Sequence, residues 1–155
     1  MMMGYLKDPE YTREVIRDGW YITGDIGTLD EDGFLTITDR LSRFSKIGGE
    51  MVPHVKIEEA IQQVLGTFDL RCVVTSLPDE QKGERLMVLY EELGIDADEL
   101  LSRLRGLNLP NLWLPRKENC FPIDSIPLLG TGKVDLRGVR ERAEQLDLSR
   151  RAGEV

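Results

Sequence analysis

Two short apolar runs joined by a tight bend constrain the fold of this chain most strongly. The first is LRCVVTSLPD, residues 70–79, which ends at a Pro-Asp pair, and the second is ERLMVLYEE, residues 84–92. Both runs are typical of strands, and the Lys82-Gly83 bend joins them. The segment KENCFPID, residues 117–124, is a third strand candidate. These segments predict a small sheet.

Three further segments carry apolar residues at helical spacing and are expected to pack on that sheet. The first begins near Val55 and stops at Gly66, and the second begins near Asp98. The third begins near Asp135, which is well placed as an N-cap. The apolar stripes are, in chain order, Ile57, Ile61, Val64 and Leu65; Leu100, Leu101, Leu104 and Leu107; and Leu136, Val139, Ala143 and Leu146.

The N-terminal part of the chain has the pattern of turns and short strands. An Asp-Glu-Asp-Gly turn at residues 30–33 separates IGTL from FLTI, and this arrangement predicts a β-hairpin. Together the elements predict an α+β fold, in which a short N-terminal β-hairpin segment is followed by a small mixed sheet with about three helices packed on it.

Composition excludes several classes of function. The chain has 155 residues, of which 41% are apolar, and this suits one packed domain or one domain plus part of another. It contains no run of about 18 apolar residues that would span a membrane and no secretory signal. A net charge of −8 without a basic block argues against nucleic-acid binding. The two cysteines, Cys72 and Cys120, lie far apart and are expected to be small core residues in a reducing compartment. With only one histidine besides, no tetrahedral zinc site is predicted.

The segment IPLLGTGKVDLRG, residues 126–138, places Lys133 at a flexible Gly-Thr-Gly bend. A phosphate-binding P-loop is excluded, because that motif needs glycine at the position of Pro127 and Ser or Thr at the position of Val134. Two interpretations remain open at this point. The lysine is either a solvated residue of an ordinary turn, or a cation that reaches a site in another domain and stabilises charge on a phosphoryl or carboxylate oxygen.

Residues 18–53, DGWYITGDIGTLDEDGFLTITDRLSRFSKIGGEMVP, closely resemble a signature of the adenylate-forming enzymes, which include acyl-CoA synthetases, luciferases and peptide-synthetase adenylation domains. The family pattern is Gly-Trp-x-x-Thr-Gly-Asp, then Asp-x-x-Gly, a Gly-Arg-like pair, a Gly-Gly-Glu-like loop and, far downstream, Gly-Lys. All these elements occur here in order and cover almost the whole chain. SRFSKIGGEMVP and PLLGTGKVD are most similar to the acyl-[acyl-carrier-protein] synthetase / 2-acylglycerophosphoethanolamine acyltransferase group.

The resemblance implies a reaction in two steps. A fatty acid and ATP, as Mg-ATP, first give an acyl-adenylate and pyrophosphate. The acyl group then passes to a pantetheine thiol, on coenzyme A or on the phosphopantetheine arm of an acyl carrier protein. The resemblance also implies that a large N-terminal adenylation domain binds most of the ATP, while a small C-terminal domain rotates between the steps.

Residue roles come from the positions that match the family's motifs. Lys133 matches the adenylation lysine, and the surrounding motifs favour this role over that of a solvated lysine. Asp25 matches the carboxylate that accepts hydrogen bonds from the ribose hydroxyls of ATP, with a turn cap as the alternative. Arg40 matches an arginine near the ribose and phosphates, with a solvated charge at a strand end as the alternative, and Asp39 replaces the usual glycine before it.

Two further motif positions concern the transfer step. Ser42 matches the family's hinge, where Asp or Lys is commoner, and a small serine can still absorb a change of dihedral angle. Gly48, Gly49 and Glu50 match the loop that lines the pantetheine tunnel, where glycine permits close approach of the backbone to a ligand. A tight turn before the following helix uses the same property and is compatible with this role.

The resemblance also predicts how the chain is organised. Residues 1–38 are expected to be the tail of the large N-terminal adenylation domain, and residues 39–155 the mobile C-terminal lid domain. The chain would then be a fragment or split subunit that is inactive alone. The alternative is a non-catalytic, stand-alone lid-like module that binds an acyl carrier protein or a partner synthetase. A cytoplasmic location is expected, and any contact with the inner membrane face is left to regions outside the chain.

Overall fold

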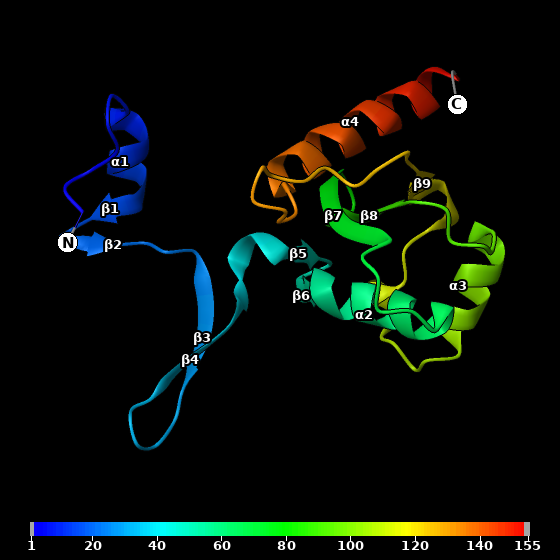
Figure 1. Cartoon of the computed structure of the whole chain (residues 1–155), viewed down its shortest axis with the longest axis horizontal. Coiled ribbons are helices and arrows are strands. Elements are labelled where there is room, and N and C mark those ends of the chain that lie inside the picture. The colour runs from blue at the N-terminus through cyan, green and yellow to red at the C-terminus, as the bar shows by residue number, and fades with distance from the viewer. Residues whose placement is uncertain (1, 154–155) are drawn as a thin grey trace. The chain divides into compact units, whose positions relative to one another are not determined.

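A computed structural model describes residues 2–153, and the chain divides after Ser42 into two compact units (Figure 1). The first unit contains helix α1 (Pro9–Val15) and two small antiparallel sheets. These are β1 (Ile16–Arg17) with β2 (Trp20–Tyr21), and β3 (Asp25–Leu29) with β4 (Leu35–Arg40). The predicted N-terminal hairpin is confirmed as β3–β4. Helix α1 was not predicted, although Asp8 caps it and Pro9 occupies its first position.

The second unit is built on a five-stranded sheet. Its strands are β5 (Phe44–Ile47), β6 (Glu50–Pro53), β7 (Cys72–Asp79), β8 (Gly83–Tyr90) and β9 (Cys120–Pro122). The order is β6-β5-β8-β7, and β9 pairs with β8. Because β9 is parallel to β8 while the other pairs are antiparallel, the sheet is mixed, as predicted.

The two predicted central strands are confirmed as β7 and β8, which pair with each other on either side of the bend. Cys72 pairs with Tyr90 at one end and Asp79 with Gly83 at the other. The short strands β5 and β6 were not predicted. Gly48 and Gly49, which interrupt the sequence pattern, form the two-residue turn between them with φ angles of 59° and 91°.

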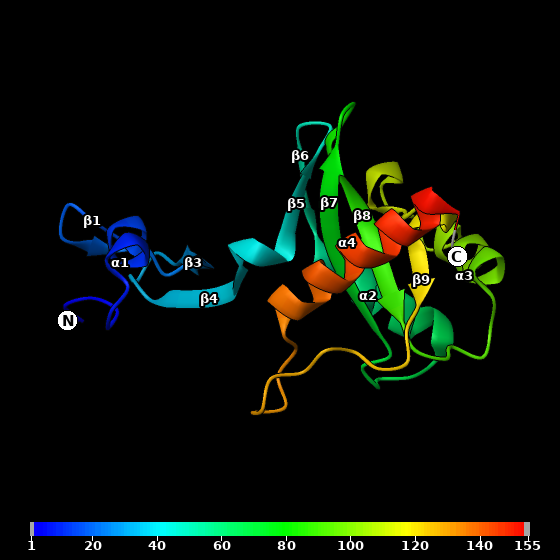
Figure 2. The same cartoon turned by 90° about the horizontal axis from the view of Figure 1, so that it is seen from above.

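Helices cover both faces of this sheet. Helices α2 (His54–Leu65) and α3 (Ala97–Arg105) lie on one face, and α4 (Leu136–Ala152) lies on the other (Figures 1 and 2). Alternate residues of β7 and β8 enter the two cores, with Val74 and Val88 facing α2 and α3 while Val73 and Leu89 face α4. The predicted α+β fold with three helices on a small mixed sheet is therefore confirmed.

The predicted helical stripes are buried to different extents. Ile57, Ile61, Leu100, Leu101, Leu104, Val139 and Ala143 are buried in the two cores. Val64, Leu65, Leu107 and Leu146 are only partly buried and pack against the edges of these cores, and Leu136, in the first turn of α4, is half-buried. Short 3₁₀ turns at Leu41–Arg43, Asn111–Trp113 and Lys117–Asn119 complete the described chain, in which no helix has the length and apolar content needed to cross a membrane.

The buried stripe of α3 generates a stability prediction. Leu104 is fully buried, whereas Leu148 on α4 is 66% exposed. We expect Leu104→Ala to lower the free energy of unfolding by about 2–5 kcal/mol, because it leaves a cavity in the core. The matched Leu148→Ala change should alter it by less than about 0.5 kcal/mol. Urea unfolding followed by circular dichroism measures both, and equal effects of the two changes would contradict the assigned core.

Candidate functional site

Lys133 lies in a tight loop that projects from the second unit, visible in orange in Figure 2. Gly132 N donates to Leu129 O at 2.8 Å, and Leu129 N donates to Lys133 O at 2.7 Å. Gly132 has a φ of 80°, which only glycine adopts readily. The side chain of Lys133 is exposed and forms no ion pair with any residue in the described range 2–153. The ammonium group is thus free to meet an anion from outside the unit.

Both ends of this loop are fixed to the body of the unit. On the N-terminal side, Ile126 is buried in the α4-side core, and its N–H donates to Glu91 Oε1 at 2.9 Å. On the C-terminal side, Asp135 caps α4 by accepting from Gly138 N at 3.1 Å, which confirms the predicted N-cap. The loop that carries Lys133 is therefore anchored at both ends. Leu128 and Leu129, in the same loop, are also exposed.

Asp25 and Arg40 are brought together in the first unit. They face each other across the β3–β4 pair, and Arg40 Nε lies 3.0 Å from Asp25 Oδ1. The Asp25 side chain is 21% exposed, and no residue of the described chain other than Arg40 donates to its carboxylate. The second carboxylate oxygen therefore remains available as a hydrogen-bond acceptor. The sequence placed both residues near one ligand but gave no sign that they pair with each other.

Gly48, Gly49 and Glu50 form the exposed end of the β5–β6 hairpin. Gly48 N donates to Lys82 O at 2.9 Å, so this hairpin is held against the bend between β7 and β8. Figure 2 shows this turn at one end of the sheet and the Lys133 loop at the other. The structure thus places the two predicted elements of the second unit apart rather than in one pocket.

A pocket beside the glycine turn was missed at the level of the sequence. It has a volume of about 530 Å³. Ile47, the residue before the glycine turn, lines it, together with five basic residues and four acidic ones. Lys117 is paired with Asp98, and Arg116 lies 3.9 Å from Glu118, whereas Lys82 and Arg105 have no ion pair within residues 2–153. These cations come from separate parts of the chain, so no local pattern could have indicated that they share a pocket.

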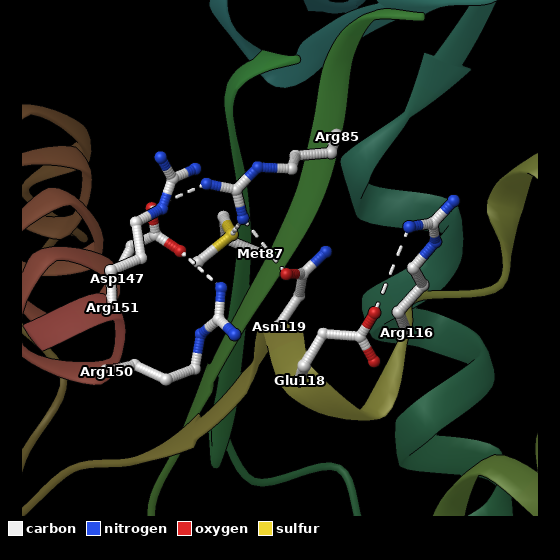
Figure 3. A network of polar contacts seen from close by, with 8 residues as sticks. All are labelled: Arg85, Met87, Arg116, Glu118, Asn119, Asp147, Arg150 and Arg151. Atoms are coloured by element: carbon white, nitrogen blue, oxygen red, sulfur yellow. Dashed lines mark hydrogen bonds and ion pairs between the residues drawn. The ribbon is translucent and has the colours of Figure 1, made fainter. Parts of the chain in front are cut away.

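A polar network holds α4, which follows the Lys133 loop, on the sheet (Figure 3). Arg85 of β8 donates to Asp147 Oδ2 at 2.6 Å and to Asn119 Oδ1 at 3.0 Å. Arg150 and Arg151 also contact the same carboxylate at 3.1 and 2.9 Å. Burial raises the pKa of Asp147, but the hydrogen bonds from Arg85 and Arg150 outweigh burial and hold the pKa below its usual range.

Ser42 is exposed and is the last residue of the first unit. It lies in the middle of the single 3₁₀ turn Leu41–Arg43, and its hydroxyl makes no hydrogen bond to any described residue. The predicted site residues are thus divided between the units, with Asp25, Arg40 and Ser42 in the first and the glycine turn and Lys133 in the second.

Sequence comparisons relate the chain to a class of ligases. No family model matches it. It is 35% identical over 145 residues to a feruloyl-CoA synthase from an Amycolatopsis species, a match that covers 92% of this chain and 28% of that enzyme. It is 33% identical over 147 residues to a long-chain-fatty-acid–CoA ligase from Yersinia pestis, covering 91% of this chain and 25% of that enzyme.

A structural comparison agrees with these relationships. The ATP-bound structure of MatB from Rhodopseudomonas palustris matches with a TM-score of 0.71 and 27% identity, over 94% of this chain and 29% of that one. The chain therefore matches the C-terminal domain of the adenylate-forming superfamily, and it spans about a quarter of the length of the relatives it resembles.

The depressed pKa of Asp147 generates a prediction about pH. A carboxylate whose pKa is lowered by folding stabilises the protein above its unfolded pKa, and this stabilisation is lost as the pH falls through the folded pKa. We expect Asp147→Asn to lower the free energy of unfolding at pH 7 by about 3 kcal/mol, because Arg85 loses its buried partner. The difference from the wild type should shrink below about pH 4.

The matched control is Glu144→Gln on the same helix, where the carboxylate forms an exposed ion pair with Arg140. This change should cost less than about 1 kcal/mol at any pH. Urea unfolding at several pH values gives both comparisons. A deficit of Asp147→Asn that stays constant from pH 7 to pH 3 would show that the network does not depend on the carboxylate charge.

Proposed function

We propose that this chain is the mobile C-terminal segment of an ATP-dependent, AMP-forming ligase that joins a carboxylic acid to a thiol. The observation that supports this best is the environment of Lys133. Its ammonium group is exposed and without an ion pair in the described chain, on a loop with two fixed ends, in a chain that resembles acid–CoA ligases over 92% of its length.

In the first step, the carboxylate of the acid attacks the α-phosphate of ATP, bound as its magnesium complex, and pyrophosphate leaves. Negative charge is then shared between the attacking oxygen and the phosphoryl oxygens. A lysine held close to these atoms stabilises that charge, and it contributes most where water is excluded. Lys133 has the required charge and reach, and the free tip of its loop can enter a pocket that another domain provides.

Asp25 and Arg40 suit the nucleotide of the same step. An ionised carboxylate only accepts hydrogen bonds, which fits a pair of ribose hydroxyls. Arg40 orients Asp25 through one oxygen and leaves the other for a ligand, and the Arg40 side chain itself is mostly exposed. This pair would bind the ribose and hold one cation close to the phosphates.

In the second step the acyl group passes to a pantetheine thiol. The glycine turn offers a backbone without side chains, along which a narrow pantetheine arm can lie. The adjoining pocket is of mixed charge, but its cations Lys82, Arg105 and Arg116 suit the phosphates at the nucleotide end of coenzyme A. We therefore favour coenzyme A as acceptor, with the phosphopantetheine of an acyl carrier protein, and hence the acyl-carrier-protein synthetase / acyltransferase subgroup, as the second candidate.

The first unit supports the proposal that a large adenylation domain accompanies this chain. One face of the β3–β4 hairpin and its adjoining turn carry apolar side chains that are 63–70% exposed, namely Leu29, Phe34, Leu35 and Ile37. Val15 is the only buried apolar residue among residues 2–42. Because a two-stranded hairpin is only marginally stable alone, this face is expected to be covered by the large domain. The alternative, a stand-alone lid-like module, does not explain what would cover this apolar face of the hairpin.

The role of Lys133 is tested by separating the half-reactions in the intact ligase. We expect Lys133→Ala to lower the rate of adenylate formation by about a hundredfold or more, because charge in the transition state loses its partner. Transfer from pre-formed acyl-adenylate to the thiol should stay within about threefold of the wild type. Lys56→Ala on α2, where the lysine pairs with Glu59, is the control. Normal pyrophosphate release by Lys133→Ala would refute the proposed role.

The pocket beside the glycine turn gives a prediction for the acceptor. Replacing Arg105 and Arg116 together by alanine should raise the KM for coenzyme A by about tenfold, because charge-assisted hydrogen bonds to phosphate are lost. Adenylate formation should not change, and Arg140→Ala on α4 should affect neither step. If the double variant instead weakens transfer to an acyl carrier protein while transfer to coenzyme A is normal, the carrier protein is the acceptor.

A further inference from the structure

Strand β8 has a glutamate at each of its ends, and each carboxylate accepts a hydrogen bond from a segment that leads to a candidate functional element. Glu84 is the second residue of β8, and Glu91 follows Tyr90, its last residue. Both glutamates are half-buried. They therefore lie at opposite ends of the strand, one towards the glycine turn and the other towards the Lys133 loop (Figure 2).

Glu84 attaches the hairpin that carries the glycine turn. Strands β5 and β8 pair at a single position in the described chain, where Ile47 is opposite Gly83. Next to this position, Lys46 N donates to Glu84 Oε2 at 2.5 Å, and Glu84 Oε1 accepts from the hydroxyl of Ser76 at 2.6 Å. The carboxylate therefore connects β5 with β7 across β8, and both of its oxygens are used within the protein.

Glu91 attaches the segment that leads to the Lys133 loop. Its Oε1 accepts from Ile126 N at 2.9 Å. In the part of the chain that the structure describes, no further hydrogen bond connects residues 124–134 with residues 44–123. This single contact is therefore what fixes the direction in which the backbone leaves the sheet towards Lys133.

These hydrogen bonds supply a direction that apolar packing lacks. Ile126 and Ile47 are buried, but burial holds a side chain in a core without fixing the orientation of the backbone beside it. A hydrogen bond from a backbone N–H to a carboxylate is charge-assisted, and it weakens steeply when its angle is distorted. Glu91 is itself held in place, because its own N–H donates to Arg71 O at 2.9 Å.

We infer that Glu84 and Glu91 are positioning residues that act on different steps of the reaction. Glu91 acts on adenylate formation through the Lys133 loop, and Glu84 acts on transfer to the thiol through the glycine turn. The inference rests on the proposed function, which assigns one step to each of these elements. Neither carboxylate has to touch a substrate, because a misplacement of a catalytic element by about 1 Å can lower a rate by about a hundredfold.

The half-reactions of the intact ligase separate the two roles. We expect Glu91→Ala to lower the rate of adenylate formation by about tenfold, while transfer from pre-formed acyl-adenylate stays within about twofold of the wild type. Glu84→Ala should leave adenylate formation within about twofold and lower kcat/KM for the thiol acceptor by about tenfold, mainly through a higher KM.

The matched controls are Glu92→Ala for Glu91 and Glu80→Ala for Glu84. Both control residues are exposed, and their carboxylates accept no hydrogen bond from any residue in the described range. Each control variant should keep both half-reactions within about twofold of the wild type. A control that matched the effect of its partner variant would mean that loss of negative charge near the end of β8, and not loss of the contact, causes the defect.

Glutamine at the same positions tests geometry against charge. Glu91→Gln and Glu84→Gln keep an acceptor oxygen, so the half-reaction that each alanine variant impairs should return to within about threefold of the wild type. Glu84 also lines the pocket assigned to the phosphates of coenzyme A, where a carboxylate would repel phosphate. If Glu84→Ala and Glu84→Gln both lower the KM for coenzyme A, Glu84 acts by this repulsion and its positioning role is wrong.

Amide hydrogen exchange of this chain, followed by NMR, checks the contacts without enzymatic activity. Glu91→Ala should accelerate exchange at Ile126 by about tenfold or more and leave Lys46 within about twofold, and Glu84→Ala should do the opposite. The amide of Val88, in the middle of β8, should stay within about twofold in both variants. Acceleration at all three amides would mean that the variant only destabilises the fold.

Two outcomes in the ligase would overturn the inference. If either alanine variant impairs both half-reactions equally, that glutamate stabilises the unit as a whole. If the changes in exchange are local but neither half-reaction slows, the positioning roles are wrong. A wild-type ligase that forms no acyl-adenylate would instead contradict the proposed function, and local changes in exchange would still show that each carboxylate holds its own segment.

Discussion

Burial of the β7–β8 pair on both faces determines how the second unit is assembled. Val74 and Val88 require cover from α2 and α3, and Val73 and Leu89 require cover from α4. Once α4 is fixed by Val139 and Ala143 on this sheet, its capped N-terminus fixes one end of the Lys133 loop. Packing of α4 on the sheet therefore anchors the loop that carries the exposed Lys133.

The same sheet fits the proposal that one body serves two chemical steps. Its bend between β7 and β8 holds the glycine turn through the bond from Gly48 N to Lys82 O, while the Lys133 loop emerges at the other end. A body with a functional element at each end need only rotate, and not refold, to present first one element and then the other to the same site. The proposed position of such a rotation is the exposed turn at Ser42, at the boundary between the two units.

Local patterns in the sequence identified the elements with strong periodicity. The apolar runs at 70–79 and 84–92 and the three helical stripes gave the central strands and α2, α3 and α4, because periodic burial leaves a direct trace in the sequence. Strands β5 and β6 have four residues each, on either side of Gly48 and Gly49, which is too short for a pattern of alternation to be recognised. Helix α1 has a capping signal but buries only Val15, so no apolar stripe marks it.

The candidate site was predictable where a motif is contiguous and not where it is assembled by folding. The exposure of Lys133 and the cap at Asp135 follow from a turn that the sequence shows directly. The pairing of Asp25 with Arg40 depends on a register that shifts between Ile26 and Gly27, and a pattern of alternation does not reveal such a shift. The pocket with Lys82, Arg105 and Arg116 depends on three separate segments meeting beside β8: the β7–β8 bend, the end of α3 and the residue before the 3₁₀ turn Lys117–Asn119.

We propose that this chain supplies a catalytic cation to a nucleotide pocket that another domain provides. It is tested most directly by measuring pyrophosphate release by the matching large domain before and after the purified chain is added. We expect slow release from the large domain alone, none from the chain alone, and a saturable increase of about a hundredfold or more when the two are mixed. No increase on mixing, or ATP–pyrophosphate exchange by the isolated chain, would contradict it.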